Sequence, residues 1–157
     1  LAKLLSRSNV KITASSINKE LINKLKSEIK ISEVSPEDLF KTKCDVISPC
    51  ALGGAINNTV KNQLKCLAIV GAANNQLESP DIGDWLLSKN IIYSPDYLVN
   101  SGGVIAIASE INKTENLLDK YLKKIGNRLT SVLEESKKKG KSTDFVSRRI
   151  AWERINS

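Results

Sequence analysis

Three short apolar runs, each followed at once by a loop of small residues, constrain the fold of this chain more than any other feature. The runs are residues 45–47, 66–70 and 91–93, and the loops are residues 48–57, 71–76 and 94–103. Short apolar runs bounded by Gly, Pro and Asn are typical of buried strands. Glycine lets another backbone or a ligand approach the loop closely. Three such units in succession are typical of a nucleotide-binding α/β sheet at the carboxyl edge of its strands.

The remaining periodicity predicts helices between the strands. Expected helices cover residues 1–7, 17–28, 57–63, 79–87 and 99–111, with another starting at Ser35-Pro36, and further strands are expected at residues 10–14 and 31–34. Strands that alternate with helices at this spacing predict an α/β fold with a doubly wound, mostly parallel, Rossmann-like sheet. From residue 115 onward, apolar residues recur at intervals of three and four residues, which predicts a long helix. Gly140 is expected to end this helix, and a final helix to follow it.

The chain is long enough for one domain with a substantial core, at 157 residues. No apolar run approaches the length of about 20 residues that a membrane span needs, so no membrane partner is expected. The net charge of +7 is uneven, because residues 113–157 hold 12 basic and 6 acidic residues against 12 and 11 in residues 1–112. We interpret this tail as a solvated helical surface. Its basic residues do not alternate with aromatic residues in the way that would indicate nucleic-acid binding.

The three cysteines, Cys44, Cys50 and Cys66, form no CxxC pair, and the chain contains no histidine. These facts exclude a Cys/His zinc site and a histidine-based triad. We therefore expect no metal, and reduced, mostly buried thiols in a cytoplasmic protein.

Taken together, the strand and loop segments resemble the cofactor-binding domain of the glutamate/leucine/phenylalanine/valine dehydrogenases, and the leucine-type members most of all. The resemblance spans most of residues 1–112 and continues more weakly to the end. It implies a partial NAD(P)-binding Rossmann domain at residues 1–112 and a C-terminal helical segment of the same domain at residues 113–157. Residues 1–5 resemble the helix that follows the family's glycine turn, so we expect a fragment that lacks that turn, the first strand and the catalytic domain.

The resemblance also assigns residues of a cofactor site. Cys50 and Ala51 correspond to a loop that passes beside the adenosine and ribose. Asn75 corresponds to an asparagine at the nicotinamide ribose, and Asn100 to one at the nicotinamide or substrate end. An amide suits both places, because it donates and accepts hydrogen bonds without adding charge.

One position departs from the family pattern. NAD-linked members carry an Asp just before Ile-Asn at the end of the second strand, whereas this chain has Ser16 before Ile17 and Asn18. Without that carboxylate the 2′-phosphate of NADP is not repelled. No arginine lies beside Ser16, however, to attract this phosphate. NAD is the expected cofactor and NADP stays open. Ser16 serves as a helix N-cap, as a ribose contact, or as both.

Val104 and Ile107, which follow Gly102-Gly103, match the pair that lines the substrate side-chain pocket in leucine-type members. The alternative is that both are core residues. Two branched aliphatic residues favour a branched-chain amino acid over glutamate, whose carboxylate requires a polar partner. The implied reaction of the intact protein is reversible oxidative deamination of a leucine-like L-amino acid to its 2-oxo acid and ammonium.

Nothing in this chain matches the family's catalytic lysines or aspartate, so the chain alone is expected to be inactive. The resemblance also implies that the intact protein is a homo-oligomer. Three other interpretations remain: a fragment of a phenylalanine, valine or glutamate dehydrogenase; a non-catalytic, degenerate nucleotide-binding domain; and a basic binding module that uses the tail.

Overall fold

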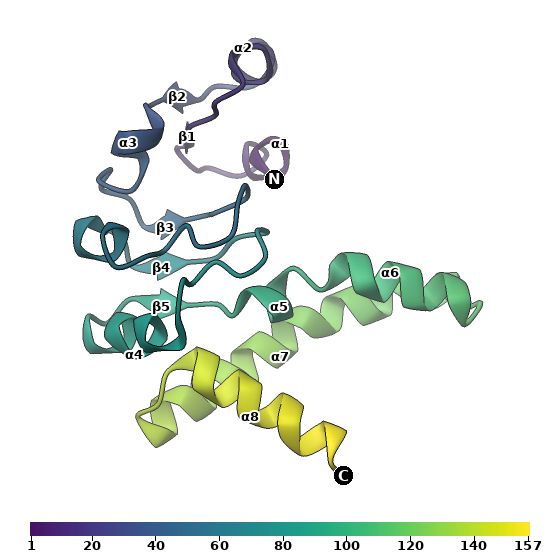
Figure 1. The fold of residues 1–157 in the computed structure, drawn as a ribbon. Helices are drawn as coiled ribbons and strands as arrows, with labels where there is room; N and C mark the ends of the chain where they lie inside the picture. The colour runs from purple at the N-terminus through teal and green to yellow at the C-terminus, as the bar shows by residue number, and fades with distance from the viewer. The chain divides into compact units, whose positions relative to one another are not determined.

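A computed structural model describes residues 1–157, which divide into two compact units. The first unit comprises residues 1–43 and 63–65, and the second comprises residues 44–62 and 66–157. Helices and short strands alternate up to residue 93, and helices alone follow it (Figure 1). Every strand pair is parallel, which confirms the predicted α/β fold with a parallel sheet. The predicted domain boundary at residues 112 and 113 stays a prediction.

The first unit is built around one parallel strand pair. Its elements are α1 (Ala2–Leu5), β1 (Thr13–Ala14), α2 (Lys19–Glu28), β2 (Ser32–Glu33) and α3 (Pro36–Leu39), and β1 pairs with β2. Side-chain caps define two helix starts, because Asn18 accepts the N–H of Leu21 and Ser35 accepts the N–H of Asp38. Ile22 is the single buried apolar side chain of this unit.

The second unit contains a three-stranded parallel sheet in the order β3 (Val46–Ile47), β4 (Ala68–Ile69), β5 (Ile92–Tyr93). The register places Ile47, Ile69 and Tyr93 in one row, and all three are buried. In the neighbouring row Val46 is 53% and Ile92 50% exposed. The predicted buried strand at residues 45–47 is therefore buried on one face only, because successive side chains of a strand point to opposite faces.

Helices cover the buried face of that sheet. They are α4 (Pro80–Ser88) and α8 (Thr143–Ile155), both of which contact β5, and α7 (Leu118–Lys139), which packs on α8. Ile82, Leu86 and Val146 are fully buried there. The Thr143 hydroxyl donates to the Tyr93 carbonyl at 2.6 Å, which ties the start of α8 to the end of β5.

Several helix predictions need correction. Only residues 60–63 of the predicted helix 57–63 are helical, as the 3-10 helix η1 (Val60–Gln63), since Asn57 turns the chain by accepting the N–H groups of Thr59 and Val60. The predicted helix 99–111 is two helices, α5 (Asp96–Val99) and α6 (Gly102–Ile111). The chain breaks between them at Asn100, whose side chain bonds to another loop instead of pointing to solvent.

The C-terminal prediction is confirmed. The 3-10 helix η2 (Glu115–Leu117) leads into the 22-residue helix α7, which ends at Gly140. Gly140 has φ of 60°, the left-handed conformation that glycine adopts at helix ends. Helix α8 follows and is capped by Ser142, which accepts the N–H of Phe145. No helix combines the length and apolar character that crossing a membrane requires.

Candidate functional site

The three loops that follow β3, β4 and β5 meet at the carboxyl edge of the sheet. The Ala73 N–H donates to the Pro49 carbonyl at 3.0 Å, and the Gly54 N–H donates to the Asn75 carbonyl at 2.7 Å. The Ile56 N–H donates to the Gln76 carbonyl at 2.9 Å. These bonds join the loop after β3 to the loop after β4. The predicted convergence of small-residue loops at one sheet edge is therefore present.

Close backbone packing explains the glycines of these loops. A Cβ on Gly71 would lie 2.1 Å from the Pro49 carbonyl oxygen, far inside any allowed contact. A Cβ on Gly53 would lie 3.0 Å from the Asn74 carbonyl oxygen. Both glycines thus permit loop-to-loop contact, and Gly54 adds a turn with φ of 66°.

A buried polar network fixes the loop of residues 71–76. The Gln76 side-chain amide donates to the carbonyls of Gly71 and Ala73 at 2.8 and 2.9 Å. The Asp96 carboxylate accepts the Gln76 N–H at 2.8 Å and the Tyr97 N–H at 2.7 Å. Gln76 is fully buried and Asp96 is 5% exposed. Sequence reasoning missed both residues, and only the proline before Asp96 hinted at a fixed turn there.

The structure places the two predicted asparagines in different situations. Asn75 has φ of 51° and is exposed, and its side-chain amide has no hydrogen-bond partner in the chain. The Asn100 amide donates to the Asn74 side-chain oxygen at 2.6 Å and to the Ala73 carbonyl at 3.4 Å. Asn100 therefore joins the loop after β5 to the loop after β4, while Asn75 is open to a ligand.

Cys50 and Ala51 are exposed on the loop after β3. The Cys50 sulfur lies 3.4 Å from the Ser48 hydroxyl, and all three cysteines are free. The prediction of mostly buried thiols is wrong, because Cys50 is exposed and Cys44 and Cys66 are half-buried. Desolvation raises the pKa of Cys66 to about 11, with a further contribution from Cys44, so this thiol stays protonated at neutral pH.

Ser16 and Ile17 belong to the first unit, at the end of β1. The Ser16 hydroxyl accepts the Asn18 N–H at 3.1 Å, and Ile17 is 92% exposed. The interpretation of Ser16 as the N-cap of α2 is wrong, because Asn18 caps this helix. Ser16 instead shapes the turn that leads to the cap, which leaves its predicted ribose contact as a prediction.

Val104 and Ile107 lie on α6, one turn apart. They are 72% and 59% exposed, so neither is a core residue of this chain. Ile111, one further turn along, is 75% exposed and extends the same apolar stripe. The stripe starts directly after the loop that holds Asn100.

Two tyrosines lie near this loop, the buried Tyr93 and the partly buried Tyr97. Burial raises the pKa of Tyr97 to about 12 and raises the pKa of Tyr93 above its ordinary range, so both phenols stay protonated at neutral pH. The Tyr97 hydroxyl lies 3.2 Å from the Asp144 carbonyl, and Arg148 pairs with the Asp144 carboxylate at 2.8 Å. No group of three or more His, Cys, Asp or Glu side chains is arranged to hold a metal ion.

A sequence profile of the Glutamate/Leucine/Phenylalanine/Valine dehydrogenase family matches residues 5–153. The chain belongs to this family. The leucine dehydrogenase of Bacillus cereus is 38% identical over 160 residues, which cover 100% of this chain and 43% of that protein. The chain thus spans less than half the length of this relative.

Solved structures of family enzymes show the same fold. The crystal structure of L-tryptophan dehydrogenase from Nostoc punctiforme matches 99% of this chain and 47% of that one, with a TM-score of 0.94 and 32% identity. A hetero-hexameric glutamate dehydrogenase from Thermus thermophilus matches 98% of this chain and 49% of that one, with a TM-score of 0.68 and 16% identity. The structural match therefore confirms the Rossmann-like fold.

Proposed function

We propose that this chain is the cofactor-binding part of an NAD(P)-dependent amino acid dehydrogenase that acts on a branched-chain L-amino acid. Residues 1–112 would form most of the cofactor-binding fold and residues 113–157 its C-terminal helical segment. The protein would be a cytoplasmic homo-oligomer. The observation that carries the proposal is the loop cluster at the carboxyl edge of the β3–β4–β5 sheet, where open α/β folds bind their ligands.

The residues at this edge fit a dinucleotide. The exposed, unpartnered Asn75 amide offers a donor and an acceptor beside a backbone that Gly53 and Gly71 bring close. Asn75 and Asn100 would hold the nicotinamide end, and Cys50 and Ala51 the adenosine and ribose. Ser16 and Ile17 would contact the adenine ribose. When bound, the nicotinamide supplies the acceptor for the hydride that leaves the substrate α-carbon.

The chain's own contribution is to bind and orient. Gln76 and Asp96 fix the loop that carries Asn75, because their bonds are buried and hold three backbone groups of that loop. Such fixed positioning lowers the entropy cost of reaching a reactive geometry. No lysine or aspartate here matches the family's catalytic groups, so we propose that the 157 residues alone turn over no amino acid.

The exposed stripe on α6 supports an aliphatic substrate. Val104 and Ile107 face away from the core. No basic residue lies between them in the sequence that would pair with a carboxylate on the substrate's side chain, as in glutamate. An apolar pocket discriminates by fit, at roughly 1–3 kcal/mol for one methylene. Leucine and tryptophan dehydrogenases belong to one family, so their substrate pockets would differ in the size of the side chains at such positions.

Substitution of Ile107→Ala in the full gene product tests the substrate assignment. A larger pocket should shift kcat/KM from leucine and valine toward phenylalanine by about tenfold or more. Steady-state kinetics with the three amino acids measure this ratio. Ile111→Ala, one turn along the same stripe, is the matched control and should change the ratio less than about twofold. An equal loss on all three substrates would place the pocket elsewhere.

Ser16→Asp tests the cofactor assignment in the same gene product. A carboxylate accepts hydrogen bonds from the two ribose hydroxyls and repels a 2′-phosphate, so preference for NAD over NADP should rise by about tenfold. The measurement is kcat/KM for both cofactors. Ser15→Ala, at the neighbouring position, serves as control. An unchanged ratio in Ser16→Asp would show that Ser16 only shapes the turn before α2.

A further inference from the structure

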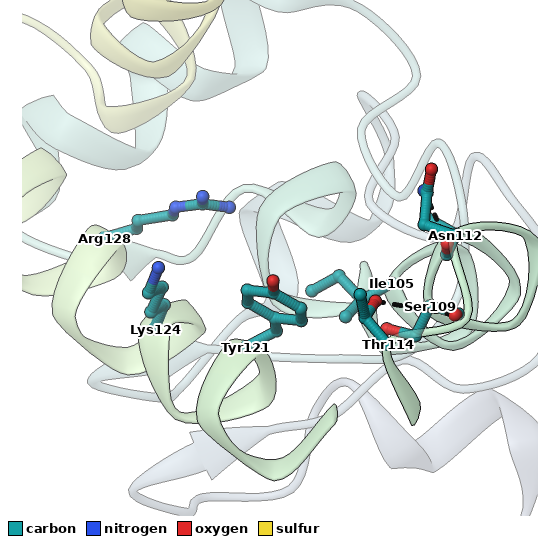
Figure 2. Close-up of a pocket in the computed structure, with 8 residues that line it drawn as sticks. Ile105, Ser109, Asn112, Thr114, Tyr121, Lys124 and Arg128 are labelled. Carbon is teal, nitrogen blue, oxygen red and sulfur yellow. Dashed lines mark hydrogen bonds between the residues drawn. The ribbon is translucent and has the colours of Figure 1, made fainter. Parts of the chain in front are cut away.

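A pocket of about 330 Å³ lies between α6 and α7, and none of the residues assigned to cofactor or substrate lines it. Its two walls are formed by Ile105, Ala108 and Ser109 on α6 and by Tyr121, Lys124 and Arg128 on α7. Figure 2 shows the three α7 side chains on one side of the pocket and Ile105 and Ser109 on the other. The volume is near the lower end of the range for small-molecule sites.

Two positive charges in this pocket have no counter-ion. Lys124 and Arg128 are four residues apart on one face of α7, and neither lies within 4.0 Å of a carboxylate. Three basic residues of the C-terminal helices do have a counter-ion: Lys139 and Arg149 pair with Glu135, and Arg148 pairs with Asp144. No Asp or Glu lines the pocket.

Two hydroxyl groups add neutral donors. Ser109 lines the pocket and is, as a whole residue, only 3% exposed. Tyr121 also lines the pocket, and its ring holds the Lys124 ammonium 5.3 Å from the ring centroid. Both hydroxyls lie in the pocket lining, so an acceptor on a ligand can receive a hydrogen bond from them.

The α6 wall carries two apolar side chains beside Ser109, and Asn112 and Thr114 also line the pocket. Ile105 and Ala108 offer hydrocarbon surface next to the cationic side, which suits a ligand with a charged end and a short aliphatic end. An inorganic anion would leave that surface unused. An amino acid would bring its ammonium group toward Lys124 and Arg128, with no carboxylate to accept it.

We infer that the α6–α7 pocket binds a small organic carboxylate that lacks an ammonium group. The site is separate from the proposed cofactor and substrate contacts, because Val104 and Ile107 do not line it. It therefore provides a place where an aliphatic acid binds without entering the proposed reaction, and its binding needs neither cofactor nor turnover.

Isothermal titration of the 157-residue chain with isocaproate, L-leucine and phosphate tests this inference. Isocaproate and leucine differ only in the ammonium group. Saturable isocaproate binding, at least about tenfold tighter than leucine or phosphate, is the expected result. Phosphate binding as tightly as isocaproate, or no saturable isocaproate binding at millimolar concentration, would overturn the inference.

Variants locate the binding. Arg128→Gln should weaken isocaproate binding about tenfold or more, and Arg128→Lys should restore it to within about threefold, because the charge returns. Lys123→Gln removes the same charge from an exposed position beside the pocket and should change the affinity less than about twofold. Equal losses in Arg128→Gln and Lys123→Gln would mean that net charge alone attracts the acid. Circular dichroism melts confirm that each variant is folded.

Discussion

The two compact units of this chain differ sharply in how they are held together. The unit of residues 44–62 and 66–157 buries nine apolar side chains, from Ile47 to Val146, behind a three-stranded sheet. The unit of residues 1–43 and 63–65 buries one, Ile22, behind a two-stranded sheet. A two-stranded sheet with little apolar burial is marginal in water. Stability in this chain is therefore concentrated where the loop cluster lies.

The smaller unit depends on polar interactions instead. Asn18 and Ser35 cap its helices, and Lys19 and Lys26 both pair with Glu33. Caps contribute roughly 1 kcal/mol each and exposed ion pairs less. The caps and ion pairs therefore fix where the helices of this unit start, but they add little to its free energy of unfolding. The comparison predicts that core substitutions matter most in the larger unit and that a pH below 4.5 matters most in the smaller one.

The largest expected effect comes from Leu86→Ala. Leu86 is fully buried on α4, so truncation should lower the free energy of unfolding by about 2–5 kcal/mol. Its neighbour Leu87 is 38% exposed, and Leu87→Ala should cost less than about 1 kcal/mol. Urea denaturation followed by circular dichroism measures both. Similar costs for the two substitutions would contradict the assignment of the core to this unit.

A smaller loss is expected from Gly71→Ala. The added methyl would meet the Pro49 carbonyl, so the loops after β3 and β4 must separate at a cost of about 1–3 kcal/mol. Gly103→Ala is the control, since nothing lies within 4 Å of its position on α6 and alanine favours a helix. That variant should unfold at the same temperature or slightly higher. Equal destabilisation would show that loop contact does not require Gly71.

The smallest effect is the acid response of the smaller unit. Hydrogen bonds from Lys19 and Lys26 lower the pKa of Glu33 from 4.5 to about 2. Because the folded pKa is the lower one, the stabilisation is present above pH 4.5 and is lost progressively as the pH falls toward 2. Glu33→Gln should remove this dependence from amide exchange in α2, whereas Glu37→Gln should retain it. Identical pH profiles for the two variants would exclude Glu33 as the source.

Local chemistry explains the sequence predictions that are confirmed. Gly140 ends α7 because its left-handed conformation favours glycine, and Ser35-Pro36 starts α3 with a cap followed by proline at the first turn. The parallel strands were predictable because runs of apolar residues alternated with helical periods. These features depend on a few consecutive residues and need no distant partner.

The missed features all depend on distant partners. The break between α5 and α6 arises because Asn100 bonds to Asn74, 26 residues earlier. Gln76 and Asp96, 20 residues apart, fix the loop around Asn75 through buried bonds. The half-exposed face of β3 follows from what packs on the sheet, which the composition of residues 45–47 does not encode. No local pattern indicates any of these contacts.

The sequence by itself determined the order of strands and helices, the parallel α/β class, the small-residue loops and the family. Short-range preferences and hydrophobic periods fix such features, because each is decided within a few turns of chain. Only the tertiary structure decided which loop glycines are required, that Asn75 is open while Asn100 is engaged, and that Lys124 and Arg128 line a pocket without a counter-ion. These depend on the free energy of contacts between residues far apart in the chain, which exist only once the elements have packed.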